Sequence, residues 1–275
     1  MSGRRTGASL LLHLALALVA ISTLLPLIWM ISASVMPAGE ATTDPPPFFP
    51  SRVTLEHYQT LFTRLDLGRH LLNSLVVALG ATFLSLLFNS MAGYAFAKLR
   101  FPGRDRLFAI LVGALAIPGQ VGMLPLFLLT REMGLVNTYG GVLVPTLVSI
   151  LGIFLIRQFA LSIPDELLDA ARIDGAGELR IFFSIVLPLS RPILATLALL
   201  TFMNTWNDFL WPLIVLTDES MQTMPVALAG LVGERALDTE LMMAGAVLTV
   251  MPVLLVFLVL QRHYIEGILM GSVKG

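Results

Sequence analysis

The segment PDELLDAARIDGAGELRIFFSIVLP, which spans Pro164–Pro188, interrupts the apolar character of this chain. It carries seven charged side chains, and Arg191 follows shortly after it; the seven are Asp165, Glu166, Asp169, Arg172, Asp174, Glu178 and Arg180. Long apolar runs flank the segment on both sides. Because charges are costly inside a bilayer, we expect the segment to lie in water between two membrane spans.

The composition of the 275-residue chain predicts an all-α polytopic membrane protein. Hydrophobic residues make up 56% of it and charged residues only 13%, whereas soluble domains have about 25% charged residues. The charges are segregated, so several apolar runs reach the roughly 20 residues that a helix needs to cross a bilayer. The sequence contains no cysteine, which excludes disulfides and cysteine-ligated metals.

The first span is expected at residues 10–35, after an N-terminal segment at 1–9. A cleaved signal peptide is the alternative, but the run is longer than the usual apolar region of about 7–15 residues. A proline-rich outer connection at 36–70 follows, in which Thr54 is predicted to cap a short helix. That helix either lies along the membrane surface, with Leu55, Tyr58, Leu61 and Phe62 on one face, or packs on the bundle as an ordinary loop helix.

Five further spans complete a predicted set of six transmembrane helices. The third is interrupted at Pro118-Gly119, and a tail at 263–275 follows the last one. The five are expected at Leu71–Phe96, Leu107–Leu129, Val136–Ile156, Leu187–Leu216 and Leu241–Leu260.

The basic residues predict the orientation of these spans. If the N-terminus lies inside, twelve of the 17 lysines and arginines fall on the cytoplasmic side, and the remainder fall outside, namely Arg52, Arg64, Arg69, Arg131 and Arg235. This excess agrees with the positive-inside rule. Both termini and the central segment Pro164–Pro188 are therefore predicted to be cytoplasmic.

Within the central segment, the sequence predicts two short helices that meet at Gly175. Ser162 is expected to cap the first helix, with Asp165 three residues later as in a capping box, and the second is expected at Glu178–Ile185. Small residues leave one surface flat, which suits close approach by another protein; these are Ala170, Ala171, Gly175 and Ala176. A solvated connector without a binding role remains the alternative.

Two patterns occur together here: D-A-A-x-x-D-G-A, and I-x-L-P, with nine residues between the glycine of the first and the isoleucine of the second. This combination resembles the cytoplasmic signature loop of binding-protein-dependent ABC transporter permeases. The matching positions are Asp169, Ala170, Ala171, Asp174, Gly175, Ala176, Ile185, Leu187 and Pro188. The family usually has glutamate at the position of Asp169, so this chain keeps the charge with a shorter reach.

The resemblance extends over nearly the whole chain and indicates the carbohydrate-type branch. It is carried by Asn73–Val77, Ala92–Arg104, Leu124–Phe127, Gly134–Tyr139 and Trp206–Leu213. The terminal GSVKG, residues Gly271–Gly275, is similar to the tail of the shorter permease of maltose-type importers. The resemblance implies the ABC type I importer permease fold, with a core domain at 71–262 and a coupling loop at 158–186.

This resemblance implies a multi-pass subunit of a bacterial or archaeal plasma membrane. Its implied partners are a second permease, two ATPase subunits and an extracytoplasmic solute-binding protein, without nucleic acid. The chain lacks the G-x-x-x-x-G-K-[ST] phosphate loop, so ATP and Mg are expected on the ATPase and no cofactor on this chain. Coupling to the ATPase is expected at Asp165, Leu187, Pro188 and the pattern residues 169–176, and more weakly at the tail residues Gly271, Ser272, Val273, Lys274 and Gly275.

A polar group inside the fifth apolar run is a candidate for the solute pathway. It comprises Asn204, Trp206, Asn207 and Asp208, and a carboxylate within a span is by default a functional candidate. Pairing with the partner permease and the interfacial role of tryptophan are the alternatives.

Other function classes find less support in the sequence. The four histidines lack metal-ligand spacing, and no set of residues is placed for catalysis, so we expect neither a metal site nor an enzyme. A self-sufficient secondary transporter or channel is the alternative function; it would need inverted repeats or ion-coupling residues near the midplane. The sequence does not identify the transported sugar or sugar-like solute.

Overall fold

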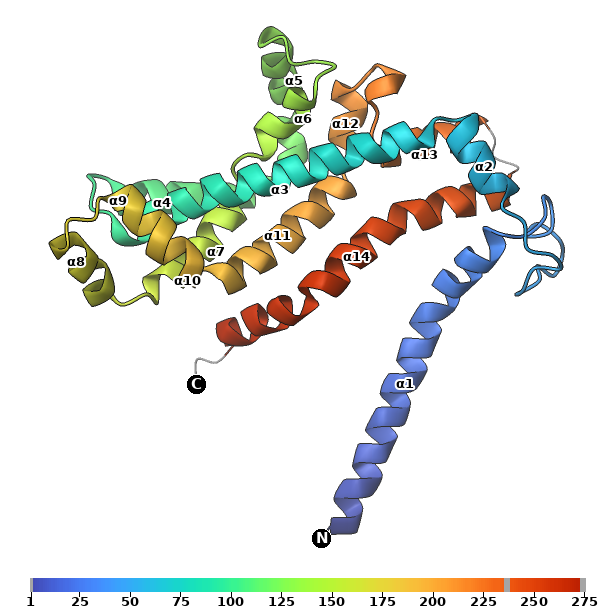
Figure 1. Cartoon of the computed structure of the whole chain (residues 1–275), viewed down its shortest axis with the longest axis horizontal. Coiled ribbons are helices and arrows are strands. Elements are labelled where there is room, and N and C mark those ends of the chain that lie inside the picture. The colour runs from blue at the N-terminus through green and yellow to red at the C-terminus, as the bar shows by residue number, and fades with distance from the viewer. Residues whose placement is uncertain (1, 235–237, 273–275) are drawn as a thin grey trace. The chain divides into compact units, whose positions relative to one another are not determined.

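The computed structural model describes the backbone of residues 2–234 and 238–272, and the side chains of residues 9, 12–230, 238–259 and 261. These residues form helices joined by turns and loops, and they contain no β-strand. Figure 1 shows the helices in chain order. Of the predicted tail, Gly271 and Ser272 belong to the last turn of α14, whereas Val273, Lys274 and Gly275 lie outside the described residues.

Three single helices are long and apolar enough to cross a membrane: residues 12–33 of α1 (Ser2–Ala33), α3 (Leu67–Lys98), and residues 239–259 of α14 (Thr239–Ser272). Three bent helix pairs meet the same test, so the described residues hold six spans if each pair is counted as one. The first, second and sixth predicted spans therefore match single helices.

The remaining spans are broken. The first pair joins Arg104–Ala116 to Gly119–Glu132 with a bend of 98°, at the predicted break before Pro118-Gly119. The second joins Tyr139–Thr146 to Ile150–Leu161 with a bend of 43°. These pairs contain α4 (Arg104–Gly113), α5 (Met123–Glu132), α6 (Tyr139–Thr146) and α7 (Ile150–Leu161).

The fifth predicted span, Leu187–Leu216, is not one continuous helix. The chain forms α9 (Glu178–Ile181), a π-helical turn at Phe182–Val186 and α10 (Leu187–Leu189), then bends by 80° into α11 (Arg191–Trp206). A separate helix, α12 (Leu210–Val215), follows. Pro192 lacks the N–H that would bond to the Pro188 carbonyl across Ser190, which explains a bend there.

The chain divides into two compact units. The first contains residues 1–68 and 227–251 and includes α1, α2 (Glu56–Thr63) and most of α13 (Met224–Glu234). Its outer connection is tied down by buried contacts, because the Ala41 N–H donates to Glu240 Oε1 at 2.7 Å and His57 Nε2 lies 2.9 Å from the Met36 carbonyl oxygen.

The predicted capping of α2 was correct in part. The Thr54 hydroxyl accepts the Glu56 N–H at 3.2 Å, although Leu55 occupies the cap position. Leu61 is fully buried, whereas Leu55 and Phe62 are exposed, so the predicted single apolar face does not form.

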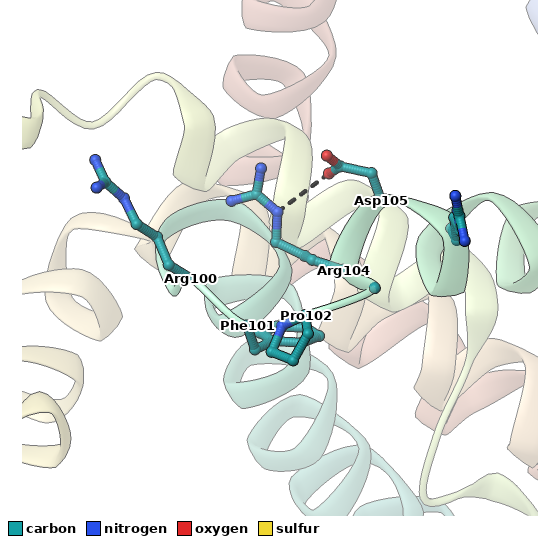
Figure 2. A pocket seen from close by; sticks show the side chains of 7 residues that line it. Arg100, Phe101, Pro102, Arg104 and Asp105 are labelled. Atoms are coloured by element: carbon teal, nitrogen blue, oxygen red, sulfur yellow. Dashed lines mark hydrogen bonds and ion pairs between the residues drawn. The ribbon is translucent and has the colours of Figure 1, made fainter.

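The second unit contains residues 69–226 and 252–275 and holds the candidate site. Its longest helix, α3, ends at Lys98, and a loop of five residues leads into α4. Figure 2 shows this loop with Arg100 and Arg104 extending from it. At the same end of α3, the central segment forms α8 (Asp165–Ile173) and α9 (Figure 1).

Candidate functional site

Helix α8 begins at Asp165 and ends in a tight left-handed turn at Gly175. Gly175 has φ +83°, a conformation that is costly for residues with a side chain. The Gly175 N–H donates to the Arg172 carbonyl and the Ala176 N–H to the Ala171 carbonyl, each at 3.0 Å. These two bonds form a Schellman motif, so the predicted turn at Gly175 is confirmed.

The prediction that Ser162 caps α8 was wrong. The Ser162 hydroxyl donates to the Phe159 carbonyl oxygen at 2.6 Å, at the C-terminal end of α7. Pro164 occupies the position before α8 and provides no side-chain cap. The Ser162 hydroxyl is directed back to α7 and makes no bond to the N–H groups of α8; local back-bonding of this kind competes with capping.

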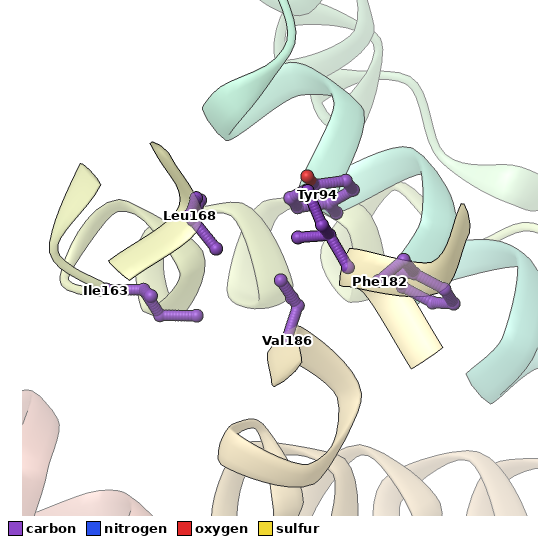
Figure 3. Packing of buried hydrophobic residues seen from close by; sticks show 6 residues of the cluster. Tyr94, Ile163, Leu168, Phe182 and Val186 are labelled. Atoms are coloured by element: carbon purple, nitrogen blue, oxygen red, sulfur yellow. The ribbon is translucent and has the colours of Figure 1, made fainter. Parts of the chain in front are cut away.

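The buried side of the central segment packs as one hydrophobic cluster on α3. Tyr94 from α3 meets Leu168 from α8 and Phe182 and Val186 from the π-helical turn, and Figure 3 shows these side chains converging together with Ile163. The rings of Tyr94 and Phe182 have centroids 5.8 Å apart. Because Leu168 and Phe182 are almost completely buried, this contact fixes α8 and the π-helical turn against α3.

Lys98 forms the first polar tie between α3 and the start of α8. Its ammonium donates to Asp165 Oδ1 and to the Ile163 carbonyl oxygen, both at 2.6 Å. The Lys98 side chain is only 7% exposed, and a cation this far from water needs such partners.

The hydrogen bond from Lys98, and then its charge, lower the pKa of Asp165 below its ordinary value. A carboxyl whose pKa is lowered by folding stabilises the folded state at pH values above its unfolded-state pKa. This stabilisation is lost as the pH falls through the folded-state pKa. The tie is therefore intact at neutral pH and breaks only in acid.

Glu178 forms the second polar tie. Its carboxylate accepts the Tyr94 hydroxyl at 2.6 Å and Arg172 Nε at 2.8 Å. Arg172 also donates to Asp169 Oδ1 at 2.6 Å. The hydrogen bond with Glu178, and to a smaller extent the one with Asp169, raise the pKa of Arg172, so its guanidinium stays charged. Through Arg172, Glu178 and Tyr94, the helices α8, α9 and α3 share one hydrogen-bond network.

The opposite face of α8 is open to solvent and partly apolar. Ile173 is 86% exposed and Leu167 is 43% exposed, and Ala170 lies between them on the same side of the helix. Two acids, Glu166 and Asp174, border these residues. An isoleucine exposed to this degree beside a fixed, flat helix face is typical of a surface that another protein covers.

A cleft of 870 Å³ lies between the end of α3 and α8. Its lining includes Lys98, Arg100 and Arg104 on one side, and Asp165, Asp169 and Arg172 on the other. The Lys98–Asp165 ion pair crosses this cleft and holds the start of α8 near α3.

Comparison with known proteins agrees with this arrangement. Residues 89–269 match the family model described as "Binding-protein-dependent transport system inner membrane component". The chain belongs to this family. The matched range contains the whole central segment.

Full-length relatives of this permease include carbohydrate permeases. The chain is 42% identical over 97% of its own length and 97% of the relative's to the arabinooligosaccharides transport system permease protein AraQ of Halalkalibacterium halodurans. It is 33% identical to the melibiose/raffinose/stachyose import permease protein MelC of Bacillus subtilis over 100% of both chains.

A solved structure has the same fold. It is the "crystal structure of a bacterial ABC transporter involved in the import of the acidic polysaccharide alginate", with TM-score 0.83, 26% identity, and coverage of 96% of this chain and 98% of that one. The permease is thus an all-α polytopic membrane protein of the carbohydrate-type branch with the ABC type I importer permease fold.

The structure places most of the predicted coupling residues on α8 or in the turn that ends it, whereas Leu187 and Pro188 lie in α10. Asp169, Ala170 and Asp174 are exposed, while Ala171 and Ala176 pack partly into the cluster. The sequence reasoning missed Tyr94, Lys98 and Glu178 as their anchors. The available signal was a tyrosine and a lysine four residues apart at the end of an apolar run, which share one helix face.

The predicted pathway residues of the permease divide into two kinds. Asn204 and Asn207 are exposed, and Asp208 is half-buried after the end of α11 with Oδ1 3.5 Å from the Trp211 N–H. Trp206 is 1% exposed, and its ring stacks on Phe202 with centroids 5.7 Å apart. The burial of Trp206 favours a packing role in this conformation, and the pathway role of the others stays a prediction.

Replacing Glu178 with glutamine is expected to loosen α8 in the permease. The NH₂ group of glutamine cannot accept a hydrogen bond, so either the Tyr94 hydroxyl or Arg172 Nε loses its partner. In this partly exposed position the loss costs about 1–2 kcal/mol of stability. Hydrogen exchange of the α8 amides should rise roughly 5–30-fold.

Glu166→Gln is the matched control, because Glu166 lies on the open face of α8 and makes no ion pair within the described residues. Its α8 exchange should equal that of the unmodified permease. Equal exchange in the two variants would show that Glu178 does not hold the helix.

Proposed function

We propose that this chain is one permease subunit of an ATP-driven importer for a sugar or sugar-like solute, most closely an oligosaccharide. With a second permease it forms the translocation pathway, two ATPase subunits supply the energy, and an extracytoplasmic binding protein delivers the solute. Both termini and the central segment lie in the cytoplasm, in accordance with the basic residues.

One observation carries this proposal: the similarity to AraQ runs through 97% of both chains, so it is not confined to the signature loop. MelC and the lactose transport system permease protein LacG of Rhizobium radiobacter, which is 33% identical over 98% of both chains, extend the same pattern. The substrates named for all three relatives are sugars of two or more units, which supports the oligosaccharide class for this permease.

In this proposal, α8 receives force from an ATPase subunit. Three features support the role: the open face with Leu167, Ala170 and Ile173, the two polar ties to α3, and the Schellman turn at Gly175. An ATPase that binds the open face differently in its two nucleotide states shifts the permease between inward-facing and outward-facing conformations.

The chain itself hydrolyses no ATP in this scheme. ATP and Mg belong to the ATPase subunits, and this permease binds neither. The tail Gly271–Gly275 provides a second contact with the ATPase, and Asn204, Asn207 and Asp208 line or border the solute pathway.

A tagged permease is expected to co-purify with a second permease and a nucleotide-binding subunit. In liposomes, that complex with its binding protein should take up labelled arabino- or galacto-oligosaccharides only when ATP is present on the cytoplasmic side. Omission of the ATPase subunit is the control and should abolish uptake. Uptake that persists without it, driven by an ion gradient, would instead establish a secondary transporter.

A further inference from the structure

The loop after α3 forms a basic hollow that the proposed transport function does not use. Its volume is 840 Å³, and it is lined by seven consecutive residues, Arg100, Phe101, Pro102, Gly103, Arg104, Asp105 and Arg106. In the view of Figure 2, the side chains of Arg100 and Arg104 extend to the same side of the loop, away from Pro102. Three arginines thus surround a hollow that contains one acid.

The positive charge of this hollow is not neutralised within the described residues. Asp105 accepts Arg104 Nε at 3.1 Å, and Arg104 also donates to the Leu99 carbonyl oxygen at 3.3 Å. Arg104 and Asp105 therefore satisfy each other. Arg100 and Arg106 form no ion pair in the part of the chain that the structure describes, so two guanidinium groups remain available for an anion.

The hollow lies between the ends of two candidate membrane spans. The spanning helix α3 ends at Lys98, and the next apolar pair begins with α4 at Arg104. The five residues between them reach at most about 18 Å when fully extended, so the loop stays close to the ends of both spans.

One side of the helix that follows the hollow is apolar and exposed. Phe108 packs toward α3 and α7, with ring centroids 5.6 Å from Phe96 and 6.4 Å from Phe154, whereas Leu107 and Ile110 are 51% and 70% exposed. These two residues are three apart and share one side of the helix. The basic hollow is therefore followed directly by an apolar surface that belongs to a candidate membrane span.

We propose that this hollow binds the phosphate of an anionic phospholipid, whose acyl chains lie along Leu107 and Ile110 of α4. Arg100 and Arg106 pair with the phosphate as charged, forked donors. The open left-handed Gly103, where an added Cβ would meet no atom within 4 Å, leaves the first N–H groups of α4 accessible to the same anion. A free phosphate matches only the arginines, whereas a phospholipid matches both the arginines and the apolar surface.

The test uses the purified complete transporter in nanodiscs of equimolar phosphatidylglycerol and phosphatidylcholine. The probe is the amount of phosphatidylglycerol that stays bound on transfer to detergent, measured by native mass spectrometry. Arg100→Gln/Arg106→Gln should weaken retention roughly 20–30-fold, since each basic group near an anionic surface contributes roughly fivefold.

The matched control is Arg4→Gln/Arg5→Gln, which removes two charges beside the first span but outside the hollow, and it should weaken retention clearly less than the Arg100/Arg106 variant does. The single variant Arg106→Gln, with an expected loss of roughly fivefold, replaces the double variant if the latter does not assemble. Equal retention in the Arg100/Arg106 and Arg4/Arg5 variants would overturn the proposal.

A second arm distinguishes the lipid from a soluble anion. Inorganic phosphate is added in excess at constant ionic strength, with chloride as reference. Phosphatidylglycerol should remain bound, because its acyl chains add contacts that phosphate lacks. Displacement by phosphate but not by chloride would assign the hollow to a soluble phosphate and refute the lipid site.

Discussion

Replacing Gly175 with valine is expected to leave the permease assembled but to uncouple ATP hydrolysis from solute uptake. Gly175 has φ +83°, and the left-handed conformation costs residues with a Cβ about 1–2 kcal/mol, more when they are β-branched. The equilibrium constant for forming the Schellman turn that ends α8 should therefore fall roughly 5–30-fold. Uptake by the reconstituted transporter should fall by up to the same factor, while its ATPase activity persists.

Gly177→Val provides a close control for that experiment. Gly177 lies two residues later with φ −73° and ψ 161°, an extended conformation that valine adopts readily. An added Cβ meets no atom within 4 Å at either glycine, so the two variants differ in backbone strain and not in steric contact. If both variants transport normally, α8 does not transmit the motion of the ATPase.

Replacing Gly93 with alanine is expected to have the largest effect on folding. An added Cβ would lie 2.7 Å from Ile156 Cβ and 3.0 Å from the Arg157 backbone nitrogen, so α3 and α7 would have to move apart. Overpacking of this kind costs about 1–3 kcal/mol or more, and membrane helices depend on small residues for close approach. The melting temperature of the purified permease should fall by several degrees, with a smaller yield of assembled transporter.

Gly80→Ala tests whether the effect belongs to that contact. Gly80 lies on the same helix, but its Cβ would meet only the Leu143 side chain, at 3.4 Å and beyond. Leucine can adjust its rotamer, so this variant should assemble with nearly unchanged stability. A melting temperature lowered equally by both substitutions would point to a general intolerance of α3 and not to a close approach at Gly93.

Much of the membrane architecture follows from the sequence, because apolar runs and prolines report it locally. The single spans and the break before Pro118-Gly119 are of this kind. The bend at Ser190 was missed because hydropathy measures how apolar a segment is and not the direction in which its helix points. Membrane helices tolerate proline where neighbouring groups satisfy the freed backbone groups, so the presence of Pro188 did not predict a bend.

The sequence predicted which segment forms the candidate site, but not how that segment is attached to the rest of the fold. The turn at Gly175 is local and could be anticipated, whereas Ser162 was assigned to the wrong helix because its hydroxyl can bond in either direction. The two ties join residues distant in sequence, Tyr94 with Glu178 and Lys98 with Asp165. A single sequence carries no information about such distances, so the attachment of α8 to α3 emerges only from the fold.

Because the two ties fasten α8 near one end of α3, the length of α3 determines how far its other end moves when the helices tilt. Its 32 residues correspond to about 48 Å at 1.5 Å per residue. Since α8 is fastened near one end, a tilt of the joined helices by about 5° about that end would carry the other end sideways by about 4 Å. A small rotation at the anchored end of α3 thus becomes a displacement of several ångströms at its other end.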